Sequence, residues 1–248
     1  MSRRDAPADV AVVGRGLRAA PRIAKDKQKG TGRGTLQRAF PTAITEDTLA
    51  VAARSLARKE PRFRHVIKSH GLPPMWAREP GFATLVFIIL EQQVSLASAR
   101  AAFEKLQAVL GTVTPDVFLA LDDAQLKTIG FSRQKMRYGR ELAHAVQAGL
   151  LDLDALLTMD DDDVRATLTK LPGIGNWTVD VYLLMVLLRA DVFPKGDLAL
   201  LIAAHRLFDL PARPTPDEIE VMAEAWRPHR AVAARLLWHF YLSERRRV

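Results

Sequence analysis

The stretch that decides the fold is Leu171-Pro172-Gly173-Ile174-Gly175-Asn176-Trp177-Thr178. The preceding residues, 163–170, have apolar positions at helical spacing, and the Pro-Gly pair ends that helix. Residues 177–188 are mostly apolar and predict a second helix, which is buried. The turn between the two helices leaves backbone N–H groups free at the start of the second one. Because these groups lie at the positive end of the helix dipole, they form a candidate site for a phosphate group.

The two glycines of this turn point to the same ligand. Without a Cβ atom at either position, the backbone of a nucleic acid can approach the turn closely. We therefore expect Gly173, Ile174 and Gly175 to contact DNA. A helical corner used only for packing is the alternative, and a Gly-x-Gly turn on its own favours that alternative.

A second informative segment, Phe193-Pro194-Lys195-Gly196-Asp197, follows the second helix. Asp197 comes directly before another apolar helix, 198–208, where an aspartate is most often an N-cap. The dipole of that helix also favours the ionised form of a carboxylate at this place. Asp197 is therefore a helix cap, a fixed negative charge available for chemistry, or both.

Taken together, the glycine turn, the apolar helix, the Phe-Pro loop and the Asp-Leu-Ala-Leu segment closely resemble the helix-hairpin-helix–Gly/Pro–Asp (HhH-GPD) family of DNA glycosylases. The resemblance runs from about Ala43 to Tyr241 and is strongest to the 3-methyladenine DNA glycosylase II branch. It implies a monofunctional hydrolase that removes alkylated purines from DNA in base excision repair. The alternatives are a glycosylase for deaminated or oxidised bases, a non-catalytic hairpin module that binds DNA, and a helical scaffold for protein interactions.

The resemblance gives Asp197 the catalytic role. Its carboxylate would stabilise the positive charge that develops on the sugar and orient or deprotonate the attacking water. Bifunctional members of the family carry a lysine in the hairpin that forms a Schiff base, and here Trp177 stands at that position. Because an indole has no amine, no lyase step is expected. Neither Lys170 nor Lys195 matches the position of the family's lysine.

A pocket for an electron-poor base needs aromatic faces. Trp177 and Trp238 match aromatic positions that line the alkylbase pocket in the resembled branch. At a third position, where that branch can carry tyrosine, this chain has Val181, and Tyr182 follows it. We predict a base pocket lined by Trp177, Trp238 and Tyr182, with core packing of the tryptophans as the alternative.

Two adjacent glutamines, Gln92 and Gln93, interrupt the apolar helices near residue 91. An enzyme that flips a base must fill the hole in the duplex or meet the orphaned partner base, and an amide can hydrogen-bond there. The Gln-Gln-Val-Ser segment also resembles the lesion-probing loop of the family. We expect both glutamines to contact DNA, with Gln93 as the inserting residue, and a plain polar loop is the alternative.

No catalytic cofactor is predicted. The chain has no cysteine, which excludes disulfides, thiol catalysis and the cysteine-ligated iron–sulfur cluster of the endonuclease III and adenine-mismatch branches of the family. The resemblance implies one structural ion, a monovalent cation held by backbone carbonyls of the hairpin. The residues concerned are Thr169, Leu171 and Ile174.

The composition predicts an all-α protein of two lobes behind a basic tail. Residues 1–40 hold ten of the 36 Lys and Arg residues and three of the 28 acids, so most of the net charge of +8 lies there. This segment is expected to be disordered, either merely solvated or a non-specific DNA tether. One lobe should contain residues 81–197, and the other should combine 41–80 with 198–248, with DNA across the cleft between them.

No apolar run reaches the roughly 18 residues of a membrane span, and the N-terminus has no signal-peptide pattern. We therefore expect a soluble, cytoplasmic protein, and the resemblance to the HhH-GPD family implies a monomer. Its expected partner is double-stranded DNA that contains damaged bases.

Overall fold

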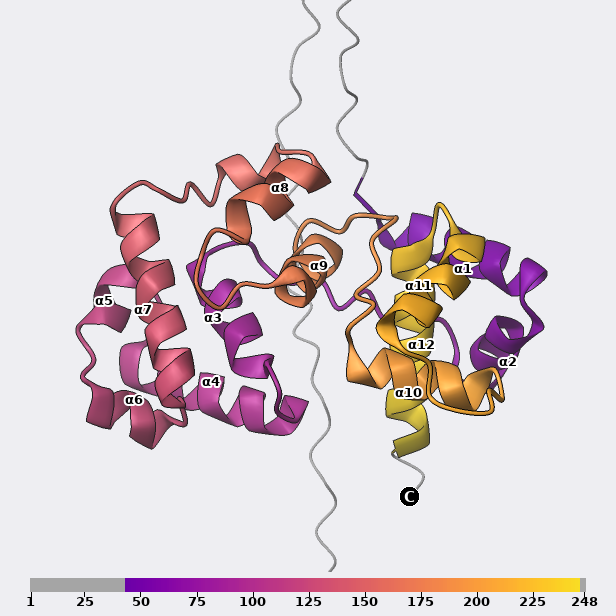
Figure 1. Ribbon diagram of the computed structural model, residues 1–248, viewed down its shortest axis with the longest axis horizontal. Helices are drawn as coiled ribbons and strands as arrows, with labels where there is room; N and C mark the ends of the chain where they lie inside the picture. The colour runs from indigo at the N-terminus through magenta and orange to yellow at the C-terminus, as the bar shows by residue number, and fades with distance from the viewer. Residues whose placement is uncertain (1–42, 246–248) are drawn as a thin grey trace, which may run out of the picture. The chain divides into compact units, whose positions relative to one another are not determined.

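The computed structural model describes residues 43–245, and Figure 1 shows their arrangement. Within this range the chain forms twelve α-helices and two short 3-10 helices, and the only β pairing is an isolated bridge between Ala43 and Arg189. The all-α prediction is confirmed. The predicted basic tail, 1–40, lies outside the described residues. None of the described helices is long and apolar enough to cross a membrane.

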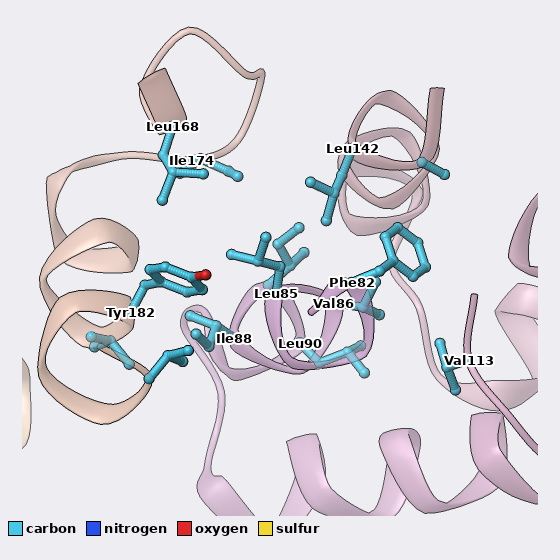
Figure 2. Packing of buried hydrophobic residues seen from close by; sticks show 14 of the residues in the cluster. Phe82, Leu85, Val86, Ile88, Leu90, Val113, Leu142, Leu168, Ile174 and Tyr182 are labelled. Atoms are coloured by element: carbon cyan, nitrogen blue, oxygen red, sulfur yellow. The ribbon is translucent and has the colours of Figure 1, made fainter. Parts of the chain in front are cut away.

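A first hydrophobic core is built by the central helices of the chain. Their bounds are α3 (Phe82–Glu91), α4 (Leu96–Leu110), α5 (Pro115–Leu119), α6 (Asp123–Ile129), α7 (Arg133–Gln147), η1 (Ala155–Leu157), α8 (Asp161–Leu168) and α9 (Asn176–Met185). Helix α3 is apolar over most of its surface, and Leu85 and Ile88 are fully buried. Figure 2 shows both residues facing Tyr182 of α9, so α3 joins the hairpin helix to the rest of this core.

A second core draws on both ends of the described chain. It is formed by α1 (Glu46–Lys59), α2 (Pro61–His70), α10 (Leu198–Leu207), α11 (Pro216–Ala223), η2 (Glu224–Trp226) and α12 (Arg230–Arg245). Helix α12 contacts α1, α2 and α10. Its residues 231–238 are all buried, and all of them except Arg235 are apolar. Between residues 43 and 245, the chain therefore begins in this core, builds the first core, and returns.

Helix starts follow local sequence signals. Thr45, Ser95, Ser132 and Asp160 each accept a hydrogen bond from a backbone N–H of the first turn that follows them. Asp160 is followed by three further aspartates in the first turn of α8, where the helix dipole favours negative charge. These short-range signals fix the start of α8, which is the first helix of the hairpin.

Candidate active site

Asp197 lies where three helices meet. It is the N-cap residue of α10, and its Oδ1 accepts a hydrogen bond of 3.0 Å from the backbone N–H of Leu200. Oδ1 also accepts one of 3.0 Å from the indole Nε1 of Trp238 on α12. Oδ2 accepts one of 3.0 Å from the indole Nε1 of Trp177 on α9. The carboxylate therefore caps a helix, as the sequence predicts, and also binds two tryptophans from different helices.

The loop before Asp197 is fixed by its own backbone and by α11. The backbone N–H of Asp197 donates to the carbonyl of Pro194 at 2.9 Å, which closes a tight turn. Lys195 donates from Nζ to Glu220 at 2.6 Å and to Asp217 at 3.2 Å, both on α11. These hydrogen bonds raise the pKa of Lys195, so its amine is protonated and engaged with carboxylates.

A third tryptophan, Trp76, belongs to the same group of aromatic residues and was not predicted. Its ring lies edge-on to Trp238, with centroids 6.4 Å apart and planes at 80°. Its φ of +50° is in the left-handed region, which is rare for a bulky side chain. Because Trp76 stands in the segment 71–81, which has no helical period, no pattern in the sequence marks it.

A buried arginine holds this segment in place. Arg235 of α12 has no exposed surface, and its guanidinium donates to the carbonyls of Met75 at 2.9 Å, Leu184 at 2.7 Å and Ala231 at 3.1 Å. Burial lowers the pKa of Arg235 to about 10. Three carbonyl groups take the place of a carboxylate partner here. The hydrogen bonds to Leu184 and Met75 join α12, which carries Trp238, to the end of α9, which carries Trp177, and to the residue before Trp76.

The two glycines of the hairpin have different roles. Gly173 has φ +84°, and a Cβ atom there would lie 2.1 Å from the ring of Tyr138, so a protein side chain fills the space beside it. We expected the missing Cβ atom of Gly173 to leave space for DNA beside the backbone. This reason is wrong, because the ring of Tyr138 fills that space. Gly175 is extended, and a Cβ atom built on it has no neighbour within 4 Å. Only the second glycine leaves open space next to the backbone.

The free N–H groups of the hairpin lie on both sides of Ile174, because within residues 43–245 the N–H of Gly173 also has no hydrogen-bond acceptor. The N–H of Ile174 donates to the carbonyl of Leu171 at 3.1 Å, and its side chain is buried in the first core. The N–H of Ile174 is therefore not available to a phosphate, and the expectation that Ile174 contacts DNA stays a prediction. No side chain caps α9, and within residues 43–245 the N–H groups of Gly175 and Asn176 have no hydrogen-bond acceptor. These are the donors that the helix dipole makes attractive to an anion.

Comparison with known proteins identifies this arrangement. The family described as HhH-GPD superfamily base excision DNA repair protein matches residues 86–228, which include the hairpin and Asp197. The chain belongs to the HhH-GPD superfamily. The match covers more than half of the chain and confirms the family expected from the hairpin and the aspartate.

Individual relatives place the chain within the superfamily. It is 29% identical over 168 residues to DNA-3-methyladenine glycosylase 1 of Schizosaccharomyces pombe, covering 66% of this chain and 73% of that protein. It is 28% identical over 181 residues to the Bacillus subtilis protein YfjP, covering 70% of this chain and 63% of that protein. The chain therefore spans a little under two thirds of the length of YfjP.

A solved structure of an HhH-GPD relative shows the same fold. The structure of the 3-methyladenine DNA glycosylase Mag1 from Schizosaccharomyces pombe, in complex with abasic DNA, matches with a TM-score of 0.71 and 25% identity. The match covers 76% of this chain and 95% of that one. It confirms the helical glycosylase fold expected for the chain.

The two glutamines of the HhH-GPD chain have different surroundings. Gln92 donates from Nε2 to the carbonyl of Gly173 at 2.8 Å and to Oγ1 of Thr178 at 3.0 Å. The amide nitrogen of Gln92 is therefore bound to the hairpin, and the expectation that Gln92 contacts DNA stays a prediction. Gln93 is exposed and has φ +56°, so the backbone turns sharply there and carries its side chain outward. The expectation for Gln93 stays a prediction.

Tyr182 does not reach a pocket. Its side chain is fully buried in the first core, and Figure 2 shows its ring among residues of α3. Within residues 43–245 its hydroxyl is buried without a hydrogen-bond partner, and burial raises the pKa of Tyr182 to about 12. The prediction that Tyr182 lines the base pocket is corrected, because no face of its ring is open to a base. Trp177, which is half-buried, and Trp238, which is 8% exposed, keep their places beside Asp197.

The hairpin carbonyls named for a cation lie in one turn. Thr169 is the C-cap residue of α8, and Leu171 and Ile174 follow it in the turn that leads to Gly175. Across residues 43–245 there is no group of three His, Cys, Asp or Glu side chains placed to hold a metal ion.

Proposed function

We propose that this HhH-GPD protein is a monofunctional DNA glycosylase that hydrolyses the N-glycosidic bond of alkylated purines in double-stranded DNA, as a step of base excision repair. The observation that carries the proposal is the carboxylate of Asp197, which is held between the indole N–H groups of Trp177 and Trp238. The names of the relatives, which are 3-methyladenine glycosylases, support the same substrate class.

The two oxygens of Asp197 have different roles. Oδ1 accepts two hydrogen bonds, from Leu200 and Trp238, whereas Oδ2 accepts one, from Trp177. Oδ2 therefore keeps more lone-pair capacity to hydrogen-bond the attacking water. The negative charge, fixed in direction by three donors, stabilises the positive charge that develops on the sugar as the base leaves. An alkylated purine already carries positive charge, so its departure does not need a second carboxylate as a general acid.

The aromatic rings beside the carboxylate suit the same substrate. A cationic purine is attracted to the faces of tryptophan rings, and Trp177 and Trp238 supply two such rings within hydrogen-bond distance of Asp197. Trp76, which packs against Trp238, adds a third. The base pocket of this proposal therefore consists of three tryptophans, with Trp76 in place of Tyr182.

The absence of a lyase step is part of the proposal. A Schiff base requires a neutral amine close to the sugar. Trp177 occupies the family's lysine position, and Lys195 is paired with Glu220 and Asp217, which keeps it protonated. Lys170 is exposed on the turn before the hairpin glycines. None of these side chains offers a neutral amine at Asp197.

The remaining expectations about partners also belong to this proposal. The uncapped start of α9 at Gly175 supports phosphate binding by the hairpin, and the exposure of Gln93 supports its insertion into the duplex. The carbonyls of Thr169, Leu171 and Ile174 remain the candidate ligands of a monovalent cation. Two separate hydrophobic cores support the division into lobes 81–197 and 41–80 with 198–248. We also propose that the protein acts as a monomer.

The test is base release from methylated duplex DNA by the wild type and the Asp197→Asn variant. We expect the wild type to release 3-methyladenine or 7-methylguanine without cutting the strand, and the variant to bind duplex but release nothing. The matched control is Asp122→Asn, because Asp122 is also an N-cap aspartate but lies at α6. Full release by Asp197→Asn, or strand cleavage by the wild type, would overturn the proposal.

A further inference from the structure

A groove between α1 and α2 gathers basic side chains that the site at Asp197 does not use. It has a volume of about 320 Å³ and is lined by Arg54, Ala57, Arg58, Arg64, Ile67 and Lys68. Four of these six residues carry positive charge. None of them hydrogen-bonds to Asp197, the hairpin or the three tryptophans in the described part of the chain. The groove is therefore a separate feature of the second core.

The charge in the groove is a local excess rather than a reflection of the whole fold. Residues 46–70 hold six Lys or Arg and three acids, whereas residues 71–248 hold twenty Lys or Arg and twenty-two acids. Of the three acids, Glu46 and Asp47 lie in the first turn of α1, and Glu60 caps α2 and pairs with Arg62. No acid among them faces Arg54, Arg58 or Lys68 across an ion pair. The cations that line the groove thus lack carboxylate partners within residues 43–245.

The scaffold holds these cations close together against their repulsion. Arg54 and Arg58 are four residues apart on α1, and Arg64 and Lys68 are four residues apart on α2. Such pairs lie on the same helix face, and like charges at this spacing destabilise a helix. Arg64 also donates from Nε to the carbonyl of Ala57 at 3.2 Å, which carries its guanidinium from α2 toward α1. Two like-charged rows on a rigid pair of helices are the arrangement that an anionic ligand would stabilise.

We infer that this groove is a second nucleic-acid contact, which binds the phosphodiester backbone of duplex DNA independently of sequence. Three of its four cations are arginines, whose planar guanidinium groups bind phosphate through two hydrogen bonds. The groove contains no hydrogen-bonding side chain other than these cations that would read a base edge. The inference rests on the proposed function only in taking DNA as the partner, and it makes no use of the chemistry at Asp197.

The experiment compares two triple variants of the full chain. Arg54→Gln/Arg58→Gln/Lys68→Gln removes three groove charges and leaves Arg64 to hold Ala57. Lys105→Gln/Lys127→Gln/Arg213→Gln removes three exposed charges scattered over other parts of the chain, so both variants change the net charge equally. Circular dichroism and thermal melting check that both are folded. Affinity for a long undamaged duplex is then measured across a range of salt concentrations.

We expect the groove variant to lose at least about tenfold in affinity at low salt, and its plot of log affinity against log salt to become shallower by about 2 to 3, because each lost phosphate contact contributes about 0.9 to that slope. The scattered variant should stay close to the wild type. If both variants bind as the wild type does, or if both weaken equally, the groove is not a DNA contact and the inference is overturned.

Two further measurements separate DNA binding at the groove from base release and from lipid binding. Single-turnover base release at saturating enzyme should be unchanged in the groove variant; if even the wild type releases no base while the groove variant still loses duplex affinity, the proposed function fails and the groove contact stands. Binding to vesicles of phosphatidylserine and phosphatidylcholine tests the other common source of phosphate groups. If the groove variant loses vesicle binding but keeps duplex binding, the inference is overturned in favour of a lipid surface.

Discussion

The indole Nε1 of Trp177 lies 3.0 Å from Oδ2 of Asp197, and this hydrogen bond joins the helix that starts at the hairpin to the helix that starts at the aspartate. Twenty residues separate the two side chains in the sequence. The contact means that one side chain connects the hairpin, whose open N–H groups suit an anion, to the carboxylate, whose charge suits the sugar cation. A shift of the hairpin on DNA would therefore be transmitted directly to Oδ2.

Replacing Trp177 by phenylalanine tests this link. Trp177→Phe keeps an aromatic face but removes the donor to Asp197, and a hydrogen bond to a charged group is worth about 1.5–3 kcal/mol. We expect single-turnover base release to fall by about 10- to 100-fold while duplex affinity changes little. The control is Trp226→Phe, because Trp226 packs in the second core against Phe208 and Phe193. An equal fall in both variants would show that Trp177 acts only through stability.

The hairpin glycines give a second prediction. Gly173→Ala should destabilise the protein by about 2–4 kcal/mol, because φ there is +84° and the new Cβ would overlap the ring of Tyr138. Gly175→Ala should fold with nearly the stability of the wild type, since its φ is −96° and the space around it is open. Denaturant unfolding measures the first difference, and duplex affinity should fall in Gly175→Ala instead. Equal stability of the two variants would contradict the assignment.

The pattern around Asp197 could be predicted from the sequence because its parts are local. The Pro-Gly break, the glycine before an uncapped helix and the aspartate before an apolar helix each act within a few residues. Arg235 and Trp76 could not be predicted in this way. The contact from Arg235 to Met75 spans 160 residues, and Trp76 has a strained backbone in a segment without periodicity. Only tertiary packing brings Met75 to Arg235 and Trp76 to Trp238.

The adjacent residues Gln92 and Gln93 also show what could not be predicted from the sequence without knowledge of the tertiary packing. Both are amides in a polar segment between apolar helices, so their types and spacing make them equivalent. The structure separates them, since the amide of Gln92 meets a carbonyl 81 residues away at Gly173 whereas Gln93 turns outward at a positive φ. Two neighbouring side chains on one turn point in different directions, and which one reaches the hairpin depends on where the hairpin packs.

This difference between the glutamines is a third prediction. Gln92→Ala removes the hydrogen bonds to Gly173 and Thr178 and should lower the free energy of unfolding by about 1–2 kcal/mol. Gln93→Ala should leave the unfolding free energy unchanged and weaken binding to duplex that contains an abasic site. Chemical denaturation and binding to abasic and intact duplexes distinguish the two. Loss of stability in Gln93→Ala, with none in Gln92→Ala, would reverse the roles.

Tyr182 gives the last prediction, because its buried hydroxyl has no hydrogen-bond partner in the described part of the chain and its ring is closed to a base. Tyr182→Phe should leave base release unchanged and change stability near neutral pH by no more than about 1 kcal/mol, since an unpaired buried polar group is removed. Burial raises the pKa of Tyr182 from 10.0 to about 12 in the folded state, so its contribution to stability is complete below pH 10 and is lost as the pH rises toward 12. The wild type should therefore lose more stability than Tyr182→Phe between these two pH values.

Urea unfolding of both proteins on either side of pH 10 measures this difference, and base release at neutral pH is measured on the same preparations. A fall in base release by Tyr182→Phe with unchanged stability would show that Tyr182 contributes to the base pocket after all. Parallel loss of stability in both proteins would show instead that the hydroxyl reaches solvent. The expected outcome, unchanged release with a smaller alkaline loss in Tyr182→Phe, leaves Trp177 and Trp238 beside Asp197, with Trp76 packed against Trp238, as the proposed aromatic surface for a flipped base.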